Sequence, residues 1–198
     1  MRWTDREIEG QEFHDLRLEA MVNCRLVKCD LRGARLSELE TIGCTFDECN
    51  FAGANLSSSK HKGSSFLNCD LSGADFFGAG LEHSRMVGTK FGDAVLTAAR
   101  IAGGDWSYAV LRMQNLDRFD MREMKLESAD MYGCSLIEAD LRDSILTKAN
   151  LQHAKLRKAD LRGAEVSGID FRNVDIKGAR MTVDQACVFA MSFGIVLE

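Results

Sequence analysis

Six of the seven cysteines occupy positions that differ by multiples of five: Cys24, Cys29, Cys44, Cys49, Cys69 and Cys134. Thiolates bind Zn²⁺ and paired thiols form disulfides, so such an array could do either chemistry. No Cys-x-x-Cys pair with matching histidines accompanies it. If residues of successive coils stack as neighbouring strands, their Cβ atoms lie ~4.8 Å apart, longer than the ~3.8 Å of a disulfide. We expect free thiols in small inward positions, with no metal and no cofactor.

His61 and Thr41 both interrupt a series of otherwise apolar positions, and they are separated by four steps of that series. An imidazole can serve as a general base, a metal ligand or a hydrogen-bonded core residue. If the two residues stack, the threonine hydroxyl can satisfy the buried imidazole. We therefore predict a hydrogen bond between Thr41 and His61, and no catalytic role for the histidine.

Two rows of charge repeat along the chain with the same spacing as Thr41 and His61. The acidic row is Asp120, Asp140 and Asp160, and the basic row two positions further on is Arg122, Arg142 and Arg162. In one interpretation, which we favour, each row relieves the like-charge repulsion within the other. In the other, the carboxylates imitate phosphates spaced along a nucleic-acid duplex.

No arrangement of residues typical of an enzyme stands out. Aspartate recurs with the repeat, and no Ser-His-Asp set, phosphate-binding glycine loop or pair of catalytic carboxylates can be separated from that background. We expect no catalytic residues and no enzymatic activity.

The composition is that of a folded domain. The chain has 198 residues, of which 45% are hydrophobic and 28% charged, and it contains no proline. The first residues lack a signal-peptide core and no apolar stretch is long enough to cross a bilayer, so we expect a cytoplasmic protein without a membrane segment. The formal net charge of −5 argues against direct binding to nucleic acid, because neutralising phosphates requires a cationic surface.

A five-residue repeat positions all of these side chains. Every fifth residue from Met21 to Met181 is apolar, and the only exceptions are Thr41 and His61. A helix and a flat strand both repeat at shorter intervals, so this period predicts a solenoid that turns a corner after every pentapeptide. We call the apolar residue of each pentapeptide the centre.

The other positions of the pentapeptide also have characteristic residues. The position two before the centre, here called the small slot, holds Ala, Cys, Ser, Thr or Gly in most pentapeptides. The position two after the centre carries most of the 17 glycines, which predicts a tight turn there. Three successive small slots depart from the rule with the bulky residues Gln114, Phe119 and Met124, although Gly104 stands four pentapeptides before Met124 and can compensate for its volume.

The repeat divides the chain into three parts. Ile8, Phe13 and Leu18 keep the step of five in another phase, so residues 1–20 are expected to form an N-terminal cap. Residues 21–181 form the solenoid. In residues 182–198 the sequence from Thr182 to Gln185 predicts a capping box, followed by a short apolar helix that ends at Gly194, and then a tail.

The repeat resembles the A-(D/N)-L-x-x pattern of the pentapeptide-repeat family. Examples are Ala-Asp-Leu-Arg-Gly at 159–163, Ala-Asn-Leu-Ser-Ser at 54–58 and Cys-Asp-Leu-Ser-Gly at 69–73. The resemblance implies an all-β solenoid, namely a right-handed quadrilateral β-helix with four pentapeptides in each coil, here followed by a short C-terminal helix.

Within that family the sequence is most similar to the mycobacterial fluoroquinolone-resistance type, through residues 55–69, the stretch around 95–105 and the tail 178–194. The resemblance implies a DNA mimic that binds the DNA-binding saddle of the A subunit of DNA gyrase, modulates the enzyme and protects it from fluoroquinolones. On this interpretation Asp120, Asp140 and Asp160 are candidate contacts to gyrase. It also implies a homodimer, with an interface formed by Phe189, Phe193, Ile195 and Leu197.

Two other functions fit the same rod. A general interaction scaffold would bind a different protein through its flat faces, and a self-immunity factor would protect a producer against a topoisomerase-directed natural product. The charge match to DNA is partial, because the acidic stretch 105–143 is followed by the basic stretch 142–180.

Overall fold

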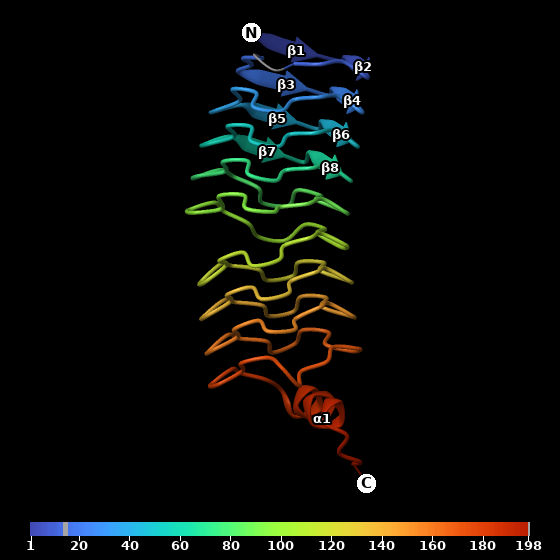
Figure 1. Ribbon diagram of the computed structural model, residues 1–198, viewed down its shortest axis with the longest axis vertical. Helices are drawn as coiled ribbons and strands as arrows, with labels where there is room; N and C mark the ends of the chain where they lie inside the picture. The colour runs from blue at the N-terminus through green and yellow to red at the C-terminus, as the bar shows by residue number, and fades with distance from the viewer. Residues whose placement is uncertain (14–15, 198) are drawn as a thin grey trace.

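The computed structural model describes residues 1–13 and 16–197, which form a rod of stacked coils that ends in one helix (Figure 1). Eight short strands belong to the first coils. They are β1 (Arg2–Thr4), β2 (Glu7–Glu9), β3 (Ala20–Val22), β4 (Arg25–Val27), β5 (Glu40–Ile42), β6 (Thr45–Asp47), β7 (Lys60–Lys62) and β8 (Ser65–Leu67). The helix α1 (Val183–Ser192) closes the opposite end. The repeat predicts a solenoid, and the protein is the right-handed quadrilateral β-helix with a C-terminal helix that the family resemblance implies.

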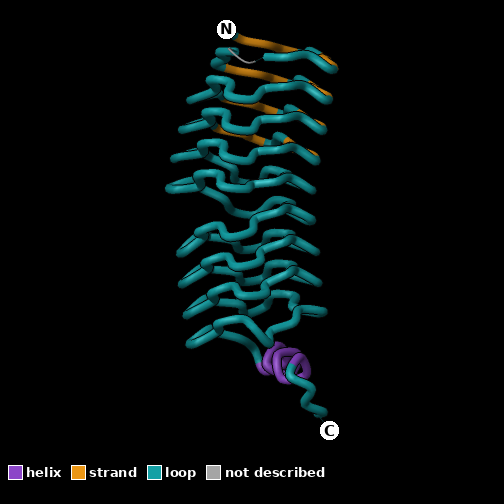
Figure 2. The backbone as a smooth tube through the Cα atoms, viewed as in Figure 1, coloured by secondary structure: helices purple, strands orange, loops and turns teal. Residues whose placement is uncertain are grey.

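The strands form two parallel sheets, in which each coil advances the chain by four pentapeptides. One sheet has the order β1-β3-β5-β7 and the other β2-β4-β6-β8. Met21 pairs with Thr41, and Thr41 pairs with His61. Beyond β8 the coils continue as single parallel bridges with the same spacing, as far as Asp160 and Arg180. In Figure 2 this part of the rod is therefore drawn as loop, although the hydrogen-bonded ladder continues through most of it.

The first coil is shorter than the others. Trp3 pairs with Met21 and Ile8 with Leu26, which is two positions less than four pentapeptides. The two missing positions fall between Leu18 and Met21, which explains why the apolar pattern changes phase there. Residues 14 and 15 of the expected cap 1–20, and residue 198 of the expected segment 182–198, lie outside the described residues.

Left-handed backbone at the corners turns the chain. The residue two after each centre has a positive φ at nearly every corner, for example 66° at Gly73 and 58° at Lys148. Glycine adopts this conformation without strain, whereas other residues incur a cost of ~1 kcal/mol. The corner position is therefore confirmed, but many corners use residues other than glycine because the ladder on both sides fixes the turn.

The centres stack into one hydrophobic column along the axis. Leu111, Leu141 and Leu161 are fully buried, as the predicted register requires. Aromatic centres contact one another in this column, and the rings of Phe46 and Phe66 stack with their centroids 4.7 Å apart. The small slots fill the space between the large centres, and most of them are also fully buried.

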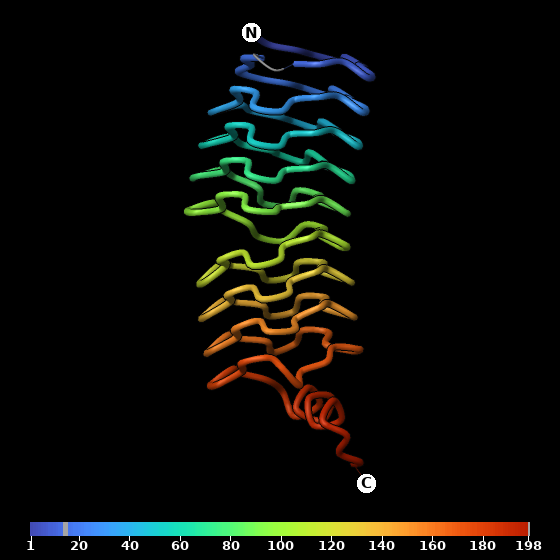
Figure 3. Tube along the Cα trace, viewed as in Figure 1, coloured from blue at the N-terminus to red at the C-terminus, as the bar shows by residue number. Residues whose placement is uncertain are grey.

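The ladder is interrupted between two coils near the middle of the rod. Parallel bridges join Asp75 to Val95 and Gly80 to Arg100, but no bridge continues from Val95 or Arg100 to the next coil in the described chain. As a consequence, the two yellow-green coils around residues 100 and 120 stand farther apart on one side of the rod than on the other (Figure 3).

The C-terminal helix closes the end of the column. Thr182 and Gln185 form the predicted capping box, with Thr182 N–H donating to Gln185 Oε1 at 2.8 Å. Gln185 Nε2 also donates to the carbonyls of Leu161 and Ala164, two acceptors in the last complete coil. The described residues include no helix long and apolar enough to span a bilayer.

We expect Leu141→Asp to prevent folding. An unpaired carboxylate at a fully buried centre costs several kcal/mol, about 4 or more, out of a typical total stability of ~5–15 kcal/mol. Soluble yield and far-UV circular dichroism measure the effect. Asp140→Asn at the adjacent outward position is the control and should fold normally. A stable, folded Leu141→Asp protein would contradict the inward register.

Candidate functional site

The acidic and basic rows are joined by ion pairs within each pentapeptide. Arg142 Nε and Nη2 donate to the two carboxylate oxygens of Asp140 at 2.8 and 2.6 Å. The backbone N–H of Arg142 also donates to Asp140 Oδ1, at 3.2 Å. The same bidentate clamp joins Asp120 to Arg122 and Asp160 to Arg162. The structure therefore brings the six predicted charges together as three neutral pairs on one face.

These contacts keep the carboxylates ionised. The Arg162 guanidinium lowers the pKa of Asp160 to about 2, and Arg122 and Arg142 lower the pKa of Asp120 and Asp140 in the same way. Asp160 is also the least accessible of the three, with its side chain 15% exposed. A partner that approaches this face meets a charge that is already compensated by a neighbouring guanidinium.

Charge is balanced over the whole solenoid. Residues 1–20 contain six acidic and three basic residues, and residues 182–198 contain two acidic residues and no basic one. The remaining 22 acidic residues of residues 21–181 are matched by 22 basic residues. The net charge of −5 thus belongs to the two ends of the sequence and not to the coils between them.

The apolar residues at the C-terminal end divide into two groups. Phe189 packs against Phe171 of the last coil, with ring centroids 5.6 Å apart, and so anchors α1 to its own rod. Phe193, Ile195 and Leu197 remain 50%, 53% and 48% exposed. The described tail therefore presents a cluster of large apolar side chains to solvent beside a helix that is fixed in place.

His61 lies in a buried polar layer, and its hydrogen bonds assign the position of each proton. Ser59 Oγ donates to the Leu56 carbonyl at 2.6 Å, so it accepts from His61 Nε2 at 2.9 Å. His61 Nδ1 consequently carries no proton and accepts from Thr41 Oγ1 at 2.8 Å. Thr41 in turn accepts from Ser64 Oγ, which accepts from the backbone N–H of Cys44.

The predicted bond between Thr41 and His61 is confirmed, and it is one link of a chain of hydrogen bonds that all run in one direction. Both ring nitrogens are satisfied only in the neutral imidazole, and burial lowers the pKa of His61 to about 3. The layer is therefore a satisfied part of the core. Its geometry provides no accessible base.

The six cysteines of the repeat are free and buried in small slots, as predicted, and the seventh, Cys187, is a free, partly buried residue of α1. Cys134 Sγ contacts the Leu111 carbonyl at 2.8 Å, the same kind of contact that Ser84 Oγ makes to His61 O at 2.9 Å. Burial raises the pKa of the Cys134 thiol to about 12, so it is not a nucleophile at neutral pH. Among the residues that the structure describes, no group of three or more His, Cys, Asp or Glu side chains could hold a metal ion.

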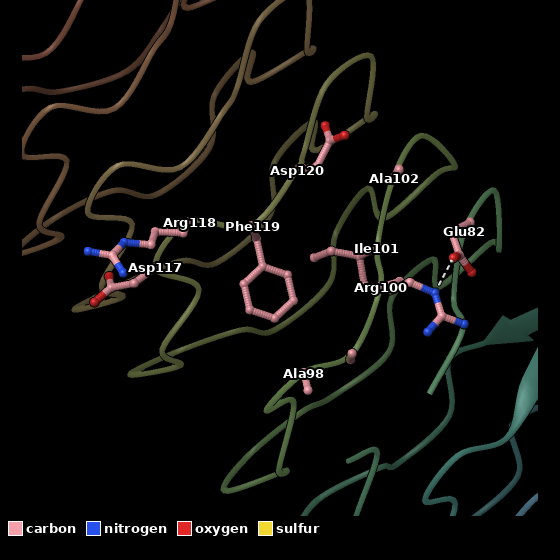
Figure 4. Close-up of a pocket in the computed structure, with 10 residues that line it drawn as sticks. Glu82, Ala98, Arg100, Ile101, Ala102, Asp117, Arg118, Phe119 and Asp120 are labelled. Atoms are coloured by element: carbon pink, nitrogen blue, oxygen red, sulfur yellow. Dashed lines mark hydrogen bonds and ion pairs between the residues drawn. The ribbon is translucent and has the colours of Figure 1, made fainter. Parts of the chain in front are cut away.

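A cleft opens where the ladder is interrupted (Figure 4). One section, of about 490 Å³, is lined by Arg100, Ile101 and Phe119 among others, and an adjoining section of about 470 Å³ lies between Thr97 and Ile137. In Figure 4 the Phe119 ring projects between the two coils and lies next to Ile101. Charged side chains stand at the rim, where Arg100 pairs with Glu82 at 2.8 Å.

Comparison with known proteins identifies the family. The family model described as "Pentapeptide repeats (8 copies)" matches residues 24–60, 49–93, 107–143, 125–163 and 154–182. The chain belongs to the pentapeptide-repeat family. Residues 94–106, which fall between two of these matches, include much of one side of the cleft.

Solved structures extend the likeness of this pentapeptide-repeat protein over its full length. A trypsin-treated variant of QnrB1, described as a plasmid-mediated fluoroquinolone resistance protein, has 27% identity and a TM-score of 0.75, with 100% of both chains covered. Full-length QnrB1 has 26% identity and a TM-score of 0.76, with 98% of this chain and 100% of that chain covered. A search of curated proteins found no match.

Some features of this pentapeptide-repeat protein were missed by sequence reasoning. Ser59 and Ser64 complete the polar layer, and their hydroxyls in small slots near His61 were the available signal. The second role of Gln185, as a donor to the last coil, had no signal beyond the capping box. The sequence showed that Gln114 and Phe119 are too large for small slots, but it did not indicate that a cleft opens beside them.

We expect the stability to fall below neutral pH because of His61. Its pKa of about 3 in the folded state lies below the ordinary value of 6.5, so only the unfolded chain takes up the proton between these values. From pH 7.5 to pH 5.0 the His61 contribution should lower the free energy of unfolding by about 2 kcal/mol. Urea unfolding at both pH values measures it.

Two variants isolate this effect. His61→Leu should lose the His61 part of the pH dependence, although it is less stable at neutral pH because Thr41 loses its acceptor. His153→Gln, at an exposed corner, should keep the pH dependence of the wild type. The same slope in His61→Leu as in the wild type would exclude His61 as its source.

Proposed function

We propose that this pentapeptide-repeat protein binds DNA gyrase at the surface where the enzyme holds DNA, and that it modulates the action of fluoroquinolones on gyrase. The observation that carries this proposal is the match to QnrB1 over the whole chain, since QnrB1 is a fluoroquinolone resistance protein. The match covers each of the two chains from end to end.

The physical basis of the proposal is a rigid rod whose outward side chains are held at fixed spacing. Residues four pentapeptides apart stand above one another, so a charge row such as Asp120, Asp140 and Asp160 repeats at the strand spacing of ~4.8 Å. A protein that binds the phosphates of a duplex could exchange them for such a row if its own cations displace the arginines. The clamps would then open on binding.

We further propose that two copies associate through the C-terminal tail. Phe193, Ile195 and Leu197 are exposed beside α1, whose position is fixed by Phe189 and Gln185. An isologous contact of this apolar cluster would remove it from water and double the length of the rod.

A specific observation favours the second candidate, a scaffold for another protein. Residues 21–181 carry equal numbers of acidic and basic residues, and the acidic row is neutralised by its own arginines. A DNA mimic is expected to present excess negative charge, whereas a balanced surface suits a protein partner with mixed charge.

The gyrase proposal predicts a measurable effect in a supercoiling gel assay. At micromolar concentration the protein should inhibit DNA supercoiling by gyrase or reduce cleavage stabilised by a fluoroquinolone. Neither effect at this concentration would contradict the proposal and leave the scaffold as the function supported by the charge balance.

The triple variant Asp120→Asn, Asp140→Asn, Asp160→Asn should weaken the effect about tenfold, because it removes three charges from one face. Asparagine keeps the turn, since Asn150 Oδ1 accepts the backbone N–H two residues on, as Asp140 Oδ1 does. Asp170→Asn is the matched control, because Asp170 and Arg172 form the same clamp on another face. Equal activity of the triple variant and the wild type would exclude the row as a contact.

The dimer proposal predicts a solution mass of twice 22.0 kDa. Ile195→Ser combined with Leu197→Ser should give a monomer, because the variant removes apolar surface from the exposed cluster. Val183→Ser, at an exposed site at the start of α1, should leave the mass unchanged. Light scattering after gel filtration measures these masses, and a monomeric wild-type protein would contradict the proposal.

A further inference from the structure

The two sides of the cleft carry backbone groups without partners. In regular coils each centre N–H donates to a carbonyl of the next coil, as Leu71 does to Lys90 at 2.8 Å. At the cleft the N–H groups of the centres Leu96 and Ile101, and of the corner residue Ala98, have no hydrogen bond to any described residue. On the opposite side the N–H groups of Asn115 and Asp120 also lack acceptors among the described residues.

The unpaired groups are complementary to an extended backbone. The first side offers the N–H groups of Leu96, Ala98 and Ile101 and the carbonyls of Ala94 and Ala99. The second side offers the carbonyls of Asn115, Asp117 and Asp120 and the N–H groups of Asn115 and Asp120. None of these carbonyls accepts a bond elsewhere in the described chain. Each side therefore has the alternating donors and acceptors of a strand edge.

The volume of two side chains explains why the cleft stays open. Gln114 and Phe119 occupy small slots one coil after Ala94 and Ala99, so large inward residues stand where most coils have small ones. Gln114 Nε2 donates to the Phe91 carbonyl at 2.7 Å. Met124 is equally bulky, but it follows Gly104, and there the ladder is intact, with Lys125 N–H donating to Gly104 O at 3.0 Å.

The cleft also admits solvent to the core. Phe119 is only partly buried, whereas small-slot residues elsewhere are mostly fully buried, and Ala94 and Ala99 are 7% and 8% exposed. Leaving both strand edges without partners would be costly if the groups were also removed from water, so an open, hydrated cleft is the state consistent with the unbound protein.

We propose that this cleft binds an extended peptide segment of a partner protein, which inserts as an additional strand between the two coils. Main-chain hydrogen bonds from both sides would hold the segment, which is the recognition mode known as β-augmentation. The proposal does not rest on gyrase binding, although Asp120 belongs both to the acidic row and to the second side of the cleft. The occupant is defined by backbone geometry together with the apolar surface of Phe119 and Ile101.

The lining restricts the sequence of the peptide. We expect the peptide to be about as long as the side of the cleft that runs from Asp93 to Ala102. The cleft passes a corner at Ala98 and Arg118, where φ is 57° and 62°, so a glycine or asparagine is favoured at the middle of the segment. A small side chain is required where the segment passes the Phe119 ring.

Amide hydrogen exchange on the full chain tests whether the cleft is open. The amides of Leu96, Ala98, Ile101, Asn115 and Asp120 should exchange much faster than the equivalent amides of neighbouring coils, such as Leu71 and Phe76. Equal protection at both sets would mean that the coils close on each other in solution, and it would overturn the proposal.

Peptide binding is tested with a phage-displayed library of random peptides about as long as the cleft, selected on the full chain. Selected peptides, resynthesised and labelled, should bind the wild type and protect the five amides named above from exchange. The double variant Gln114→Ala, Phe119→Ala restores small residues to the slots and should close the ladder, so binding should weaken at least about tenfold.

Met124→Ala is the matched control, because it removes a bulky residue from the neighbouring small slot, where the ladder is already complete. It should bind the selected peptides as the wild type does, and circular dichroism checks that both variants fold. The proposal is overturned if the selection yields no binding peptide, or if the selected peptides bind the double variant as tightly as the wild type.

Discussion

The backbone hydrogen bonds between successive coils fix the distance that each layer of side chains must fill. Neighbouring strands lie ~4.8 Å apart, and one large centre and one small slot per pentapeptide fill the space between them. A second large residue fits only if the coil before it has a smaller residue at the same position. Leucine centres above alanine slots satisfy this condition over most of the rod. Where Gln114 and Phe119 follow alanines, the hydrogen bonds are lost on two adjoining faces.

Much of the architecture could be predicted because a period of five fits neither a helix nor a flat strand. The burial of the centres, the corners and the pair of Thr41 and His61 follow from position within the repeat. The capping box follows from the Thr-x-x-Gln motif that comes after the repeat, at Thr182. The shortened first coil could not be predicted, since the change of phase before Met21 allowed either a bulge or an irregular coil. The open ladder depends on a balance of volumes that the repeat pattern does not give.

The candidate site was less predictable than the fold. Spacing alone placed Asp140 and Arg142 side by side, but it could not say whether the arginine would turn toward solvent or back onto the carboxylate. The bidentate geometry arises because the backbone N–H of the arginine already binds the same oxygen, which holds the two side chains close. On the gyrase proposal, binding through this row therefore depends on whether the partner can compete with an intramolecular guanidinium.

The polar layer around His61 also has a consequence for how the coils find their correct order. Because nearly every centre is a large apolar residue, a coil could slip by one pentapeptide and still stack leucine on phenylalanine, so many alignments are almost degenerate. Such a slip would place the His61 imidazole against a hydrocarbon side chain and leave the hydroxyls of Thr41 and Ser64 without hydrogen-bond partners. The polar layer thus raises the free energy of shifted coil pairings and favours a single register of the coils.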